Sequence, residues 1–179
     1  LSGGVAVLKI GAPTESAQKE LKQRVDDAVA ATKAAMEEGI VPGGGIALYN
    51  VYQMNTDNAK PHEILEVKAA MSIIGEALMA PLKAIITNSG ETPSRIIELL
   101  DKEKKAKKDN WLGFNAVTRK VEDLKSAGII DPLKVTKSAL LNAVYVASNF
   151  LMVGAAITEL PKKDAPTMPQ MPGGMPGDD

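Results

Sequence analysis

The segment from Ala31 to Gly45 reads ATKAAMEEGIVPGGG and contains the clearest structural signal in the sequence. Its first part continues a helical pattern, and Gly39 is the residue type that most often follows the last turn of a helix. Its last three residues are glycines, and the apolar run that starts at Ile46 predicts another helix. The sequence therefore predicts two helices joined by a short glycine-rich turn.

Two interpretations of the triple glycine remain open. Consecutive glycines let backbone N–H groups converge, and the following helix N-terminus adds partial positive charge, so the turn suits a phosphate. Neither common nucleotide fingerprint is present, because no G-x-x-x-x-G-K-[ST] occurs and Leu48 stands where G-x-G-x-x-G needs a glycine. A tight turn at which two backbones pack closely explains the same residues without a ligand.

Upstream of this turn, Pro13 and Thr14 predict the start of a long helix, and Val5 to Ile10 predicts a short strand. The helix has an apolar stripe at three- and four-residue spacings, made of Leu21, Val25, Ala28, Val29, Thr32 and Met36. Asp26 and Asp27 lie within it although Asp is a poor helix former. They suit either a solvated face or a site at which one carboxylate orients water or Mg²⁺, since adjacent residues do not share a helix face.

Downstream of the turn, helical periodicity and breaker residues predict a series of further helices. The expected helices are Ile46–Met54, Glu63–Met79, a helix with Pro81 in its first turn that Gly90 closes, Thr92–Leu100 and Val135–Leu160. Residues 55–61 are expected to form a loop, and the lysine-rich segment 101–109 is expected to be solvated. The segment 110–115 is predicted to be extended or turn-like, and 128–132 is predicted to be a turn.

Two positions in these segments could serve a ligand or only the fold. Asp131 could accept hydrogen bonds from a sugar hydroxyl, or could cap the last helix. Asn115, which follows Gly113 and Phe114, could bond a base edge, or could brace a turn. Neither position decides a function by itself.

Composition excludes several classes of protein. The 179 residues include 21 Lys and Arg against 22 Asp and Glu, so no global basic field exists to hold nucleic acid or anionic lipid. The absence of Cys and the single histidine, His62, exclude disulfides, thiol catalysis, Cys-ligated zinc and a His-rich metal site. No signal peptide is expected, and the uncharged stretch from Ser138 to Thr158 is expected to be a buried helix rather than a membrane span.

Taken in order, the motifs resemble the C-terminal third of a group I (GroEL-type) chaperonin. The segments that carry the resemblance are LSGGVAVLKIGA at 1–12, RVDDA at 24–28, the segment 31–45, GFNA at 113–116, GIIDPLKVTKSAL at 128–140 and TELP at 158–161. The resemblance implies a mostly α, multihelical fold with a small α/β portion. Residues 1–38 would be the C-terminal half of the intermediate domain, 39–160 the C-terminal half of the equatorial domain, and 161–179 a disordered Met/Gly/Pro tail.

The resemblance also implies roles for particular residues. Asp27 matches the catalytic aspartate that moves over ATP and orients the attacking water. The positions that match the nucleotide contacts are Gly44 on the backbone, Asn115, Ala116 and Val117 at the adenine, and Asp131 at the ribose. The cofactors would be ATP and Mg²⁺, and no metal ligand is expected here because the family's phosphate loop and magnesium ligands lie in its N-terminal half.

By the same resemblance, the full-length protein would be an ATP hydrolase that assists the folding of unfolded proteins as a cytoplasmic homo-oligomeric ring. Its partners would be identical subunits and, through the apical domain, a co-chaperonin and unfolded client proteins, with no nucleic acid or membrane. The isolated fragment is expected to bind ATP weakly or not at all, to have no turnover, and to self-associate. The alternative is a non-enzymatic helical assembly or interaction module that shares these motifs.

Overall fold

The computed structural model describes residues 3–57 and 64–159, and these residues are mostly helical, as predicted. The elements, in chain order, are α1 (Glu15–Glu38), β1 (Ile40–Pro42), α2 (Ile46–Asp57), α3 (Leu65–Asn88), α4 (Pro93–Lys107), β2 (Leu112–Asn115), β3 (Lys120–Asp123), β4 (Ile130–Pro132) and α5 (Leu133–Leu151). The predicted tail at 161–179 and most of the predicted loop at 55–61 lie outside the described residues; the part of that loop that is described, residues 55–57, continues α2.

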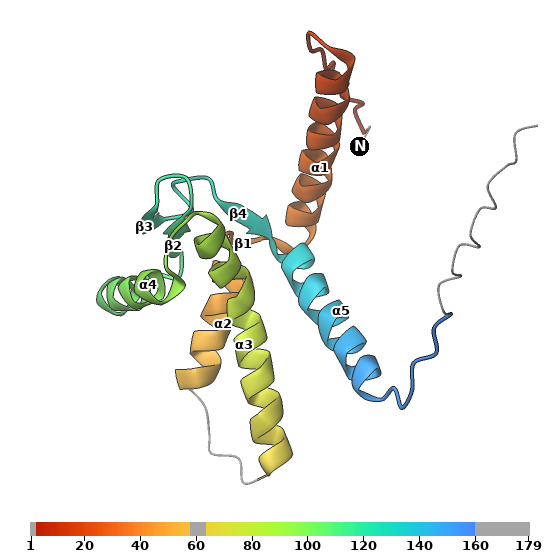
Figure 1. The fold of residues 1–179 in the computed structure, drawn as a ribbon. Helices are drawn as coiled ribbons and strands as arrows, with labels where there is room; N and C mark the ends of the chain where they lie inside the picture. The colour runs from red at the N-terminus through yellow and green to blue at the C-terminus, as the bar shows by residue number, and fades with distance from the viewer. Residues whose placement is uncertain (1–2, 58–63, 160–179) are drawn as a thin grey trace, which may run out of the picture.

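The hydrophobic core lies between α2, α3, α4 and the β2–β3 hairpin. Its buried members are Ile46, Tyr49, Leu82, Ile86, Ile96, Leu100, Leu112, Phe114 and Leu124. Figure 1 shows these elements gathered together, whereas α1 and α5 extend away from them on the far side of β1 and β4. The described part of the chain therefore consists of one packed block and two projecting helices.

Two small antiparallel sheets connect these parts. In the first sheet, β2 and β3 form a hairpin in which Leu112 pairs with Asp123 and Asn115 pairs with Lys120. In the second sheet, β1 pairs with β4, so that Val41 lies opposite Asp131. The second sheet brings the segment after α1 beside the segment before α5, although they are far apart in the sequence.

The ends of α1 are those that the sequence predicts. The Thr14 hydroxyl accepts a hydrogen bond from the Ala17 N–H at 3.3 Å, and Gly39, at φ +89°, ends the helix with its N–H donated to the Ala35 carbonyl at 2.8 Å. The apolar stripe is not buried as expected, because α1 has no buried residue. Only Leu21 and Val25 of that stripe are half-buried.

One predicted strand and several predicted helix boundaries are wrong. Val5–Ile10 is not a strand, because none of the described residues pairs with it. Pro81 does not start a new helix but lies inside the continuous helix α3, where the buried residues Leu78, Leu82 and Ile86 compensate for the lost hydrogen bond. The last helix ends at Leu151 rather than near residue 160; α5 has no buried residue to hold a further turn in place.

Helix α4 continues through the lysine-rich segment to Lys107, beyond the end predicted at Leu100. Among the described residues, one helix, α3, is long and apolar enough to cross a membrane by length and composition. Leu82 and Ile86 in its C-terminal half pack in the core block. The prediction of a buried helix at 138–158 is wrong, because α5 has no buried residue and ends at Leu151.

Candidate functional site

The glycine turn between β1 and α2 packs against two other parts of the chain. The Gly43 N–H donates to the Ile129 carbonyl at 3.1 Å, and the Ile46 N–H donates to the Gly43 carbonyl at 3.1 Å where α2 begins. A Cβ atom on Gly45 would lie 2.7 Å from the backbone nitrogen of Leu82, so only glycine fits against α3 there. The close-packing interpretation of the triple glycine is therefore confirmed for Gly45.

Gly44 is constrained by its backbone rather than by its neighbours. Its φ is +63°, and a Cβ atom there would make only an ordinary contact, 3.7 Å from the Phe114 carbonyl oxygen. Within residues 3–57 and 64–159, the N–H groups of Gly44 and Gly45 have no hydrogen-bond acceptor. They lie at the positive end of α2, which is the environment that a phosphate prefers.

The side chain of Asn115 is committed to its own hairpin. Asn115 is buried at the end of β2, and its Nδ2 donates to Glu122 Oε1 on β3 at 2.5 Å. Its Oδ1 accepts from the Val117 N–H at 2.9 Å and from the Thr118 N–H at 3.4 Å. Of the two roles that the sequence left open for Asn115, the structure shows the brace of a turn.

The next two residues of the turn that Asn115 braces differ in exposure, because Ala116 packs against the hydrophobic core and Val117 points outward. Ala116 is half-buried, and Val117 is 91% exposed. A ligand that approaches this turn meets the Val117 side chain and the neighbouring backbone, whereas the Asn115 amide already holds the turn in shape. The two bonds to Asn115 Oδ1 therefore hold the backbone of this turn in one conformation.

Asp131 lies in β4, opposite Val41, and does not cap α5, which was one of the two roles that the sequence left open for it. The N-cap is Pro132, which makes no side-chain capping bond, so Asp131 is one residue too early for that role. Its carboxylate has no hydrogen-bond or ion-pair partner within the described ranges, and partial burial raises its pKa. An acceptor that is half-buried and unpaired is available to a hydroxyl donor.

These positions converge from three separate segments of the chain. The glycine turn contacts the Phe114 carbonyl at the end of β2, and it hydrogen-bonds to Ile129 just before β4. The segments 43–45, 114–117 and 129–131 thus meet at the glycine turn and form one neighbourhood, in which Ala116 lies two residues beyond one point of contact and Asp131 two residues beyond the other.

Asp27 is not brought to this neighbourhood. It is exposed on α1, twelve residues before Gly39, which places it about 18 Å along the helix from that end. Figure 1 shows α1 directed away from the block that contains β2 and α2. Asp26 lines a groove of about 960 Å³ between α1 and the segment before it, and Asp27, on a different face of the helix, does not.

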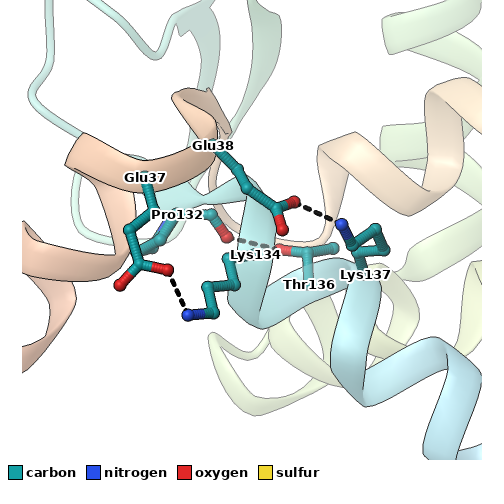
Figure 2. Close-up of polar contacts among 6 residues, drawn as sticks. All are labelled: Glu37, Glu38, Pro132, Lys134, Thr136 and Lys137. Atoms are coloured by element: carbon teal, nitrogen blue, oxygen red, sulfur yellow. Dashed lines mark hydrogen bonds and ion pairs between the residues drawn. The ribbon is translucent and has the colours of Figure 1, made fainter.

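Two ion pairs join the end of α1 to the start of α5 (Figure 2). Glu37 pairs with Lys134, and Glu38 pairs with Lys137. The Leu133 N–H also donates to the Gly39 carbonyl at 3.1 Å. The Glu37 carboxylate raises the pKa of Lys134. These contacts join α1 to α5 at the junction with β1, so a large rotation of α1 about Gly39 would separate the paired groups.

Neither ion pair was predicted, although the sequence contains a signal for both of them. Glu37 and Glu38 lie in the last turn of α1, where the helix dipole disfavours carboxylates, and Lys134 lies in the first turn of α5, where it disfavours cations. Each helix end has the charge that it should avoid, and the two charges are complementary. When two helix ends carry disfavoured charges of opposite sign, a contact between these ends satisfies both charges.

Comparison with known proteins identifies the family and the fold of this chain. The profile of the TCP-1/cpn60 chaperonin family matches residues 1–160. A crystal structure of a group III chaperonin in the open state superimposes with a TM-score of 0.73 and is 27% identical in sequence. The match covers 83% of this chain and 30% of that protein, so the chain spans less than a third of its length.

The fold is that of part of a chaperonin subunit. The chain belongs to the TCP-1/cpn60 chaperonin family.

Proposed function

We propose that this chain is the C-terminal part of a group I chaperonin subunit and contributes the adenosine side of an ATP site. Residues 1–38 form the returning half of the intermediate domain, and residues 39–160 form the C-terminal half of the equatorial domain. The observation that carries the proposal is the convergence of three separate segments, 43–45, 114–117 and 129–131, on one neighbourhood. The match to the family over residues 1–160 favours this function over a non-enzymatic assembly module.

In this proposal each segment of the neighbourhood has one task. The free amides at Gly44 and Gly45 face the phosphates, the turn at Ala116 and Val117 supports the adenine, and Asp131 accepts from the ribose. Asn115 positions the adenine-binding turn through its bonds to Val117 and Glu122. The neighbourhood described here contains no cation aimed at the phosphates, so groups outside this chain must neutralise their charge. The same groups must exclude water from the site.

Asp27 acts as the catalytic carboxylate only after α1 has moved. A carboxylate near the attacking water orients it for phosphoryl transfer. Its place on a helix that turns about Gly39 couples hydrolysis to a change in domain position. The ion pairs of Glu37 and Glu38 with α5 hold α1 in the outward position seen here.

No group of three or more metal-binding side chains lies among the described residues. We place the ligands of Mg²⁺, together with the main phosphate loop, in the N-terminal half of the subunit. The full-length protein is then an ATP hydrolase that assists the folding of unfolded proteins as a cytoplasmic homo-oligomeric ring. Identical subunits, a co-chaperonin and unfolded client proteins are its partners.

Equilibrium binding of Mg-ATP to the full-length protein tests the adenosine side. Asn115→Ala should weaken binding about tenfold or more, because the turn at 116–117 loses its brace. Val117→Ala is the matched control and should bind as the wild type does, because a flat ring needs the backbone edge rather than the isopropyl group. Equal affinity in the wild type and the Asn115→Ala variant would contradict the assignment of this turn.

A further inference from the structure

A polar cavity of about 380 Å³ lies between α2 and the C-terminal part of α4, and the proposed nucleotide site does not include it. Its lining residues are Tyr49, Tyr52, Gln53, Thr56, Asp101, Lys104, Lys105, Lys108, Asp109 and Asn110. The sequence analysis took the lysines here as a solvated run. The spacing of four from Ile96 to Leu100 to Lys104 places Lys104 on the buried face of α4 instead.

A hydrogen-bonded network forms one wall of this cavity. The Tyr49 hydroxyl donates to the Asp101 carboxylate, and Gln53 Nε2 donates to Asp101 Oδ1 at 2.6 Å and to the Tyr49 hydroxyl oxygen at 3.2 Å. Tyr49 is fully buried, and its ring stacks with that of Tyr52, their centroids 6.2 Å apart. The wall is rigid because all three polar groups have partners.

Lys104 lies in this wall with only 9% of its surface exposed. Its ammonium donates to Asn50 Oδ1 and lies 5.3 Å from the centre of the Tyr49 ring. Burial lowers the pKa of Lys104 to about 8, although Asp101 and Asp109 act in the opposite direction. At pH 7 about one tenth of the amine is therefore neutral, against roughly one part in 3,000 for an ordinary lysine.

The other cations of the cavity are at its edge. Lys105 and Lys108 are exposed and line the same cavity, where they can hold a doubly charged phosphate. The remaining titratable groups around Lys104 are Tyr49, Tyr52, Asp101 and Asp109. Asp101 already accepts from Tyr49 and Gln53, and Asp109 Oδ1 accepts from the Trp111 N–H at 2.9 Å. Both carboxylates are thus engaged within the wall and the turn.

We propose that Lys104 is a modification site that accepts an acyl group from a small acyl phosphate. The lone pair of the neutral ε-amine attacks the acyl carbon, an N–C bond forms, the C–O bond to phosphate breaks, and phosphate leaves with that electron pair. The nitrogen then loses one proton to water and becomes an amide. Lys105 and Lys108 hold the phosphate group while the bond breaks. The product lacks the cation over the Tyr49 ring, at the end of the helix that leads to β2.

The test uses the full-length protein, acetyl phosphate as the probe, and mass spectrometry to quantify acetylation at each lysine. Lys102, exposed on the same helix, is the internal control. At pH 7.5 Lys104 should be acetylated about tenfold faster than Lys102, and the rate at Lys104 should level off above pH 8. A rate at Lys104 no greater than that at Lys102 overturns the proposal.

A second variant separates phosphate binding from amine reactivity. Lys105→Ala combined with Lys108→Ala changes two exposed side chains, so the fold should be retained. It should slow acetylation of Lys104 by acetyl phosphate about fivefold or more, and should leave acetylation by the uncharged reagent acetic anhydride unchanged. If the double variant reacts with acetyl phosphate as the wild type does, the acyl phosphate assignment is wrong.

Discussion

Gly45 lies so close to Leu82 that a methyl group on Gly45 would stand 2.7 Å from the Leu82 backbone nitrogen. The glycine turn and helix α3 therefore meet backbone to backbone. This contact fixes the start of α2, and with it the free amides that we assign to the phosphates.

Gly45→Ala should destabilise the protein by about 2–4 kcal/mol, because it adds a steric clash to the cost of a left-handed backbone at φ +78°. Gly44→Ala is the matched control. Its φ is also positive, but its Cβ would meet nothing closer than 3.7 Å, so it should cost only about 1–2 kcal/mol. Thermal unfolding of the full-length variants measures the difference, and equal losses would contradict the contact with α3.

Asp131→Asn should raise the melting temperature at pH 7. The pKa of Asp131 is raised above 3.8 by burial, so its charge costs stability once the pH exceeds the unfolded value, and asparagine removes that cost. The gain should therefore shrink as the pH falls from 7 to 4. The same variant should bind Mg-ATP more weakly. The Asp131 carboxylate lowers the stability of the fold, but it is also the hydrogen-bond acceptor that we assign to the ribose.

Asp123→Asn is a control for which we expect the opposite change in melting temperature. Hydrogen bonds from Ser126 lower the pKa of Asp123, so this carboxylate stabilises the fold at neutral pH and loses that effect as the pH falls. Its replacement should lower the melting temperature at pH 7, and the loss should shrink only as the pH falls below the unfolded value of 3.8. If both variants shift the melting temperature in the same direction at pH 7, the assignment of the two environments is wrong.

The contact between Glu38 and Lys137 should show a coupling of about 0.5 kcal/mol in a double-mutant cycle with glutamine at each position. Hydrogen exchange of the Leu133 amide, which bonds to the Gly39 carbonyl, reports the opening of this junction. Each single change should speed exchange about twofold, and the double change should add little. The coupling between Glu38 and Lys137 should become smaller at high salt. If the two single changes are additive in the double variant, the pair does not hold α1.

The isolated chain of 179 residues should self-associate. Large apolar side chains are exposed along α5 and on the N-terminal half of α3, among them Tyr145, Phe150, Leu151, Leu65 and Ile73. Light scattering should give a mass above 18.9 kDa, and an apolar dye should bind. Calorimetry should detect no tight binding of Mg-ATP. A dye-negative monomer at high concentration, or micromolar binding of Mg-ATP, would contradict these expectations.

Local signals predicted much of this fold. Thr14 and Gly39 bound α1 through contacts within one turn, so the sequence alone contains the information. The expected strand at 5–10 failed because a strand depends on a partner that local pattern does not specify. Pro81 was taken as a boundary, but the packing of Leu78, Leu82 and Ile86 outweighs its cost within α3.

The candidate site was predicted unevenly for the same reason. The resemblance selected Gly44, Asn115 and Asp131, and their segments do meet. The task of the Asn115 side chain depends on Glu122, on the next strand, and no spacing rule indicates that bond. The spacing of four from Ile96 through Leu100 places Lys104 on the buried face of α4, but the run of neighbouring lysines favoured a solvated segment.

The central claim is that Asp27 supplies the catalytic carboxylate after α1 moves. ATP turnover by the full-length Asp27→Ala variant tests it most directly, with Asp26→Ala as the control on the neighbouring face of α1. We predict that Asp27→Ala lowers turnover at least about 100-fold while Mg-ATP still binds, and that Asp26→Ala keeps near-normal turnover. Normal turnover in the Asp27→Ala variant would contradict the account.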